Sequence, residues 1–209
     1  MIDAPAPLAF ILSAALGYLF GSIPFGLVLT RMAGLGDIRK VGSGNIGATN
    51  VLRTGRKDLA AATLVLDIGK AGLAGVAATA LFGFEPGLVA GAAAFFGHCF
   101  PVWLGFKGGK GVATFAGLLL ATMWKVGLLA ALTWLSMAVA FRYSSLAALT
   151  AAALLPVFTW WMGYGWFAVG VTSFLAVILA VRHSENIKRL LAGTEPKIGA
   201  SKSASGDAG

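Results

Sequence analysis

The sequence predicts an all-α integral membrane protein with about seven transmembrane helices, several of them short, an N-terminus outside the cell and a C-terminus in the cytoplasm. The composition, the apolar segments and the placement of positive charges support this. Hydrophobic residues make up 58% of the 209 residues and charged residues 11%, against roughly 25% charged residues in soluble domains. The mean hydropathy is +0.84. Such a chain must expose apolar side chains to lipid, which excludes an ordinary soluble domain and a disordered chain.

Seven apolar segments supply the predicted helices. Several are shorter than the ~20 residues of a perpendicular span, so we expect them to tilt or to be shielded by neighbours. In the first segment, Gly17 and Gly21 form a small-residue packing stripe, and Pro24 is expected to kink the helix. The segments are 8–32, 58–84, 86–106, 111–123, 125–141, 146–161 and 165–181.

The positive charges set the predicted orientation. Of the 16 Lys and Arg residues, 14 fall in alternate loops or after the seventh helix, while Lys125 lies on the other side and Lys70 lies within a helix. The positive-inside rule places the charged loops in the cytoplasm. Topology therefore explains the net charge of +8, and no nucleic acid partner is expected. We expect residues 1–199 to form one polytopic domain and 200–209 to be a disordered polar tail.

The first predicted cytoplasmic loop is rich in glycine and hydrogen-bond donors. Its glycines let successive backbone N–H groups turn toward one point and form an anion nest. The arginine that follows offers a planar fork suited to phosphate. A flexible linker is the alternative, but a linker needs no amides, hydroxyls or arginine. The candidate phosphate-binding residues here are Gly42, Ser43, Gly44, Asn45, Gly47, Thr49, Asn50 and Arg53.

A second loop opens a short predicted helix. Bare N–H groups and the positive end of the helix dipole favour an anion there, and two lysines add full charge. A basic turn would explain the lysines but not the glycines around them, so a phosphate site is favoured. Before this loop, we expect His98 to be a hydrogen-bonded packing residue and Cys99 a small buried one. The candidate residues are Lys107, Gly108, Gly109, Lys110 and Gly111.

A third polar cluster follows the last predicted transmembrane helix. On a continuing helix, His183 and Asn186 share one face. Neither has an obvious partner in the sequence, so both are candidates to face a substrate. The alternative is a solvated juxtamembrane helix. Glu185 is expected to brace the helix end by pairing with Arg182 or Arg189.

Three further polar residues have structural alternatives. Ser145 lies in a turn on the same side of the membrane, where a helix cap would also explain it. Asp67 and Lys70, at i and i+3 within the second helix, are expected to form a structural pair. With one Cys and two His in the chain, neither a disulfide nor a metal site is predicted.

The motifs at 21–24, 42–50 with Arg53, 97–111 and 183–186 resemble those of the bacterial membrane glycerol-3-phosphate acyltransferases that use acyl phosphate. The resemblance spans residues 21–199. It implies a seven-helix bundle in the inner membrane with a cytoplasmic active site. It further implies transfer of a fatty acyl group from acyl phosphate to the 1-hydroxyl of glycerol 3-phosphate, giving lysophosphatidic acid and phosphate. The partners are then both substrates and membrane lipid, with no cofactor and no metal.

The resemblance also implies roles for particular residues. Ser43 and Arg53 would be essential, and both glycine-rich loops would bind phosphate. His183 and Asn186 would act in substrate binding and catalysis, with Glu185 structural. Ser145 would contact glycerol phosphate. The proton acceptor is left open between the departing phosphate and His183.

Two other classes of protein remain as alternatives. A transporter for organic anions or phosphate esters would explain the bundle and the basic loops, but it predicts paired repeats and more polar residues at mid-membrane. A structural scaffold would leave the loop at 42–50 unexplained.

Overall fold

The computed structural model describes residues 5–199, so the predicted tail at 200–209 lies outside the described residues. Within 5–199 the regular structure is entirely helical, with short 3₁₀ turns at Ile38–Lys40, Leu52–Thr54 and Val102–Leu104. The α-helices are α1 (Ala6–Gly21), α2 (Phe25–Met32), α3 (Ala48–Val51), α4 (Lys57–Phe82), α5 (Phe84–Cys99), α6 (Val112–Thr122), α7 (Trp124–Phe141), α8 (Ser144–Trp161), α9 (Gly165–Arg182) and α10 (Ser184–Leu191).

The transmembrane helices match the sequence prediction in number and in most boundaries. Among the described residues, six helical segments are long and apolar enough to cross a membrane, counting Ala6–Met32 as one, and α6 is a shorter apolar helix of 11 residues. The first segment breaks at Pro24, as predicted. The third ends at Cys99 and not near 106, because Pro101 disfavours helical backbone at the residue before it.

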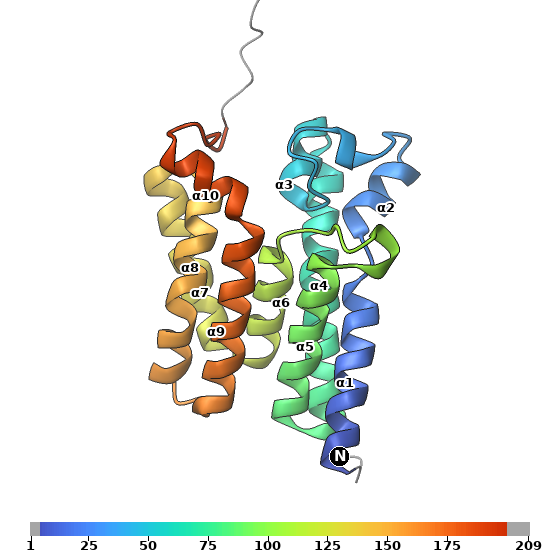
Figure 1. Ribbon diagram of the computed structural model, residues 1–209, viewed down its shortest axis with the longest axis vertical. Coiled ribbons are helices and arrows are strands. Elements are labelled where there is room, and N and C mark those ends of the chain that lie inside the picture. Colours follow the sequence, from blue (N-terminus) through green and yellow to red (C-terminus); the bar gives the residue numbers. More distant parts are fainter. Residues whose placement is uncertain (1–4, 200–209) are drawn as a thin grey trace, which may run out of the picture.

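The helices form two groups joined by α6 (Figure 1). Helices α1, α4 and α5 pack together, α7, α8 and α9 form the second group, and α6 contacts α4, α5 and α7. Helices α1 and α5 approach very closely, because a Cβ atom on Gly17 or Gly21 would overlap the α5 backbone at Ala90 or Ala94. The predicted small-residue stripe in the first helix is therefore confirmed.

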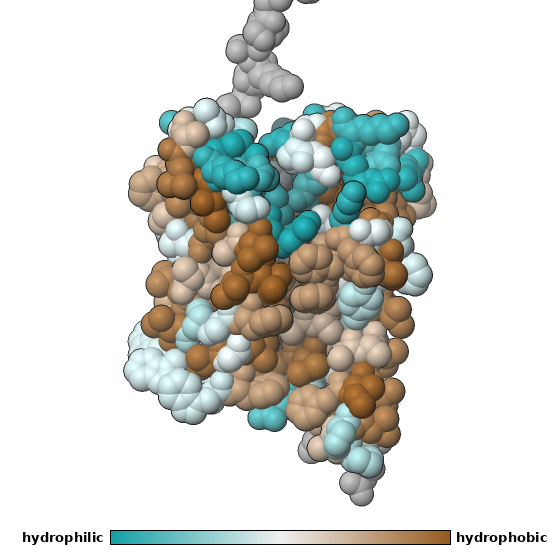
Figure 2. All heavy atoms as spheres, in the orientation of Figure 1, coloured by the Kyte–Doolittle hydropathy of each residue, from teal (hydrophilic) through white to brown (hydrophobic). Residues whose placement is uncertain are grey.

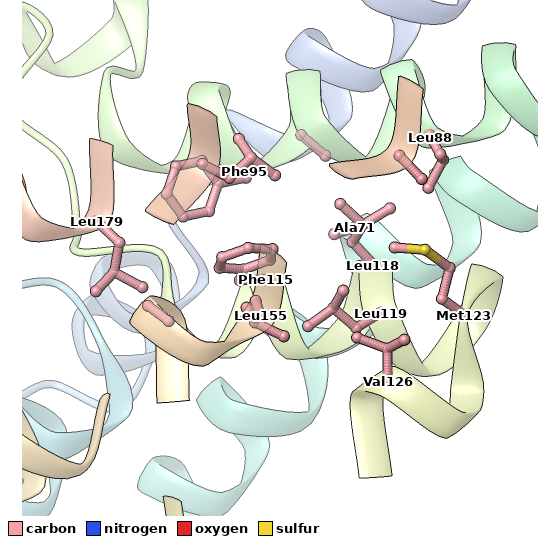
Figure 3. Close-up of a cluster of buried hydrophobic side chains, with 14 of the residues drawn as sticks. Ala71, Leu88, Phe95, Phe115, Leu118, Leu119, Met123, Val126, Leu155 and Leu179 are labelled. Atoms are coloured by element: carbon pink, nitrogen blue, oxygen red, sulfur yellow. The ribbon is translucent and has the colours of Figure 1, made fainter. Parts of the chain in front are cut away.

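A buried apolar cluster joins the two groups (Figure 3). Phe95 of α5 meets Phe115 of α6 with ring centroids 5.6 Å apart, and Leu179 of α9 belongs to the same cluster. All three side chains are at most 3% exposed. This packing fixes the end of α5, the start of α6 and the end of α9 relative to one another. Those are the points at which the second loop and His183 are attached.

Charged side chains gather at one end of the bundle. This polar end comprises residues 33–56, 100–111, 142–143 and 183–199, and Figure 2 shows hydrophilic residues there above a largely hydrophobic body. The N-terminal end of α1 lies at the opposite end (Figure 1). The exposed Trp124 and Trp166 also lie at the opposite end, and tryptophans in such positions are typical of a membrane interface. The start of α1 and residues 183–199 thus lie at opposite ends of the bundle, and which end is cytoplasmic stays a prediction.

Candidate functional site

The first glycine-rich loop holds Arg53 at the surface of the polar end. Gly42 and Gly44 have φ of +57° and +71°, a backbone conformation that favours glycine. A Cβ on Gly42 would lie 2.7 Å from Cδ of Arg53, so the arginine side chain lies directly over this glycine. Ser43 and Arg53 are exposed, and each is near Oδ1 of Asn50, at 3.3 and 3.5 Å.

Asn50 organises this loop from within. Its side chain is 1% exposed, and Nδ2 lies 2.8–3.0 Å from the carbonyl oxygens of Ile38, Val41 and Asn45. Its Oδ1 accepts the Ser43 N–H at 3.0 Å. The expectation that Asn50 donates to a phosphate is therefore wrong for this arrangement, because its amide protons bind loop carbonyls.

Some backbone donors of the nest expected in the same loop are also occupied. The Gly44 N–H donates to Val41 O at 3.0 Å, and the Gly47 N–H donates to Oδ1 of Asn45 at 2.8 Å. With the Ser43 N–H bound by Asn50, three of the expected backbone donors serve the loop itself. The side chains of Ser43, Thr49 and Arg53 are exposed.

The second loop is bound to the end of α5. The Gly108 N–H donates to Cys99 O at 3.1 Å, and the Gly109 N–H donates to His98 O at 2.9 Å. A Cβ on Gly108 would overlap His98 O, and one on Gly109 would overlap the His98 ring. The expectation that these two amides face a phosphate is therefore not met. The glycines let the loop lie against α5, and Lys107 and Lys110 carry its charge.

His183 connects α9 to α10 and is buried. Its ring is held by a hydrogen bond of 2.8 Å between Nδ1 and Leu179 O. Since a carbonyl only accepts, Nδ1 carries the proton and Nε2 keeps its lone pair. Burial lowers the pKa of His183 to about 4, and the charges of Lys110 and Arg182 act in the same direction. The imidazole is therefore neutral at pH 7.

Asn186 and Lys110 meet although they are 76 positions apart. Oδ1 of Asn186 accepts a hydrogen bond from Nζ of Lys110. Burial lowers the pKa of Lys110 to about 8, and the nearby positive charges of Arg189, Arg53 and Arg182 contribute. The structure thus brings Lys110 of the second loop into contact with the third cluster.

Glu195 is a site residue that sequence reasoning missed. Its Oε1 accepts from Ser145 Oγ at 2.6 Å and from Asn186 Nδ2 at 2.7 Å, while Oε2 accepts from Arg189 Nε at 2.7 Å. Burial would raise the pKa of this carboxyl, but these hydrogen bonds and the charge of Arg189 lower it overall. The residue follows α10 in an irregular segment, so no helical spacing in the sequence pointed to it.

Glu185 does not brace the helix as expected. It pairs at 2.8 Å with Lys188, and both side chains are at least 70% exposed. The two expected partners point elsewhere, Arg182 to the second loop and Arg189 to Glu195. An exposed pair of this kind contributes little stability.

Asp67 and Lys70 form the expected pair within α4. Nζ of Lys70 lies 2.8 Å from Oδ1 of Asp67, 2.9 Å from Nδ1 of His98 and 2.9 Å from Ile23 O. His98 is therefore a hydrogen-bonded packing residue, as predicted, and Cys99 beside it is buried. The cluster joins α4, α5 and the break between α1 and α2.

Fold and site together define a multi-pass membrane protein with cationic side chains gathered at one end, where the surface is hollowed between the two helical groups (Figure 2). The family model described as glycerol-3-phosphate acyltransferase matches residues 11–193. The chain belongs to this family.

Named relatives and solved structures agree with this assignment. The glycerol-3-phosphate acyltransferase of Maricaulis maris is 63% identical over 191 residues, covering 91% of this chain and 88% of the relative. That of Agrobacterium fabrum is 61% identical over 196 residues, covering 94% of each. The crystal structure of PlsY, an integral membrane glycerol 3-phosphate acyltransferase, in its glycerol 3-phosphate form superposes with a TM-score of 0.86 at 38% identity, covering 91% of this chain and 96% of that one. The all-helical membrane fold predicted from the sequence is confirmed.

Proposed function

We propose that this protein transfers a fatty acyl group from acyl phosphate to the 1-hydroxyl of sn-glycerol 3-phosphate. The products are lysophosphatidic acid and phosphate, and the reaction is the first step of phospholipid synthesis at the cytoplasmic face of the bacterial inner membrane. The observation that carries the proposal is the contact of Lys110 in the second loop with Asn186 in the third cluster, beside the Arg182 guanidinium that binds the same loop. Cationic side chains gathered at one end in this way favour the binding of phosphate groups. PlsY has also been solved in a lysophosphatidic acid form.

The chemistry asks the protein mainly to position its substrates. Acyl phosphate is already activated, so no covalent enzyme intermediate, metal or coenzyme is required. Arg53, Lys107 and Lys110 would hold the two phosphates against their mutual repulsion. Ser43 lies beside Arg53 and would donate its hydroxyl proton to a phosphate oxygen.

The attacking hydroxyl must lose one proton, and two groups compete to accept it. Nε2 of His183 has a free lone pair, but a pKa of about 4 makes the imidazole a weak base at neutral pH. A phosphate ester has a second pKa of about 6 and that of released inorganic phosphate is no lower, so the departing phosphate is the stronger base. We therefore assign proton transfer to the departing phosphate, with His183 and Asn186 orienting the reacting groups.

The donor is tested by phosphate release from the purified protein in detergent. Palmitoyl phosphate is supplied with and without glycerol 3-phosphate, and palmitoyl-CoA serves as the rival donor. We expect phosphate release that depends on glycerol 3-phosphate and equals the lysophosphatidic acid formed. Turnover with palmitoyl-CoA alone would contradict the acyl-phosphate donor. Movement of labelled solute into sealed vesicles, without chemical change, would instead indicate a transporter.

Two matched variants test the role of Arg53. Arg53→Lys keeps the charge but loses the planar fork, and we expect kcat/KM to fall by about tenfold or more, since hydrogen bonds to charged groups contribute about 1.5–3 kcal/mol. Arg56→Lys makes the same change at an exposed arginine that pairs with Asp58, and we expect activity close to that of the unaltered protein. Equal effects of the two substitutions would remove Arg53 from the site.

The side of the membrane is tested with vesicles. Glycerol 3-phosphate, a charged solute, does not cross a sealed bilayer. Inverted inner-membrane vesicles should therefore be active without detergent, and right-side-out vesicles only after detergent is added. The reverse pattern would place the polar end outside the cytoplasm.

A further inference from the structure

Arg182, the last residue of α9, holds the second loop from the side opposite α5. Its Nε donates to Gly109 O at 3.0 Å, and its Nη2 donates to Gly108 O at 2.8 Å. The guanidinium carbon lies 5.2 Å from the centre of the Phe100 ring. Such a fork across two successive carbonyls requires the planar geometry that arginine has and lysine lacks.

The two glycines are therefore held on both sides. Their N–H groups bind Cys99 O and His98 O at the end of α5, and their carbonyls bind Arg182. The His98 ring behind them is bound in turn by Lys70 of α4. All four backbone groups of this dipeptide have partners, so its position is set jointly by α5 and α9.

The residues that Arg182 joins are next to the reacting groups. In the chain, Arg182 directly precedes His183, and Gly109 directly precedes Lys110. Lys110 in turn binds Asn186. One guanidinium thus fixes the separation between a loop that starts from α5 and the histidine that follows α9.

We propose that Arg182 is a positioning residue for acyl transfer, which sets the place of Lys110 relative to His183. The inference rests on the proposed function, because it assumes that Lys110 binds a substrate phosphate. A displacement of about 1 Å in such a group costs roughly 100-fold in rate. Removing the guanidinium should therefore impair catalysis more than it impairs the fold, which the apolar cluster between α5, α6 and α9 also maintains.

The test compares three variants in the donor assay, with thermal unfolding in detergent as the measure of folding. Arg182→Ala is expected to lower kcat/KM by roughly 10- to 100-fold and to regain part of it when guanidinium ion is added. Sodium chloride at equal ionic strength should give no such recovery. Arg182→Lys should give an intermediate loss, because an ammonium does not bridge both carbonyls in this planar geometry. Arg56→Ala, at an exposed arginine on the same end, should keep full activity and show no response to guanidinium.

Two results would overturn the proposal. One is activity of Arg182→Ala within twofold of the unaltered protein. The other is a loss of activity that only follows the loss of folded protein, without recovery by guanidinium. If Arg182→Ala does not fold, Arg182→Lys decides, and full activity in that variant refutes the need for the fork. The unaltered protein assayed with both donors reports on the proposed function separately, and the variants are then compared with whichever donor it uses.

Discussion

Replacing Lys70 by methionine tests how much the buried polar cluster stabilises the bundle. The Lys70 side chain is fully buried, and Nζ has Asp67, His98 and Ile23 O within 2.9 Å. Methionine has a similar length and no charge, so the packing volume changes little. The Asp67 side chain, 2% exposed, loses its ammonium partner.

The expected loss is large because one buried charge remains without its counter-charge. Breaking a buried pair from one side costs about 3–5 kcal/mol. For a chain of 150–250 residues, about 1 kcal/mol lowers the melting temperature by about 2–4 °C. We therefore expect Lys70→Met to lower the Tm by about 6–20 °C. Asp67→Asn combined with Lys70→Met should recover part of this, because the uncompensated carboxylate is then gone.

Thermal unfolding of the detergent-solubilised protein measures the effect. Lys125→Met is the matched control, because Lys125 is exposed at the opposite end and contacts the Trp124 ring at 5.8 Å. A Tm of Lys70→Met no lower than that of Lys125→Met would refute the reasoning. So would a double variant less stable than Lys70→Met, since that would show that the carboxylate has other adequate partners.

Three further changes test the site. Gly42→Ala places a Cβ atom on a residue with φ of +57° and within 2.7 Å of Arg53 Cδ. Displacement of the Arg53 side chain should lower kcat/KM by roughly 100-fold. Unchanged kinetics would contradict the placement of Arg53 in the site. Because the pKa of Lys110 is about 8, Nζ loses its proton as the pH rises from about 7 to 9, and kcat/KM should fall over this range. The Lys110→Arg variant stays charged throughout and should not show this fall. Parallel pH profiles of the two proteins would assign the titration to another group. Glu195→Gln removes the charge that binds Arg189 and should destabilise the protein by about 1.5–3 kcal/mol. The effect is measured as a drop in Tm relative to Glu85→Gln, which changes an exposed glutamate at the opposite end. Equal Tm values for the two variants would show that the carboxylate charge is dispensable.

The helices were predictable because lipid imposes one simple requirement on the sequence. A spanning segment must be apolar over most of its length, and its ends are marked by charge, glycine or proline. The break at Pro24 and the contact of Gly17 with α5 follow from the same local reasoning. These features depend on residues within one segment or on the general rule that small residues allow helices to approach.

The partners of the polar side chains were less predictable because most are distant in the chain. Arg182 binds carbonyls 73 and 74 positions away, and Ser145 binds Glu195 50 positions away. Helical spacing relates only residues three or four apart. It correctly paired Asp67 with Lys70, but it assigned Arg182 and Arg189 to Glu185, since it has no information on the loop and the segment that bind them.

Some glycines of the two loops also have a packing role that the sequence did not indicate. Glycine permits a nest of free N–H groups, but it equally permits close contact between a loop and its support. Here the N–H groups of Gly44, Gly108 and Gly109 bind carbonyls. These three N–H groups are not available to a dianion, and under the proposed function the charged donors are Arg53 and Lys110. Because side chains move more readily than a backbone nest, the site depends on the contacts that hold these two cations in place.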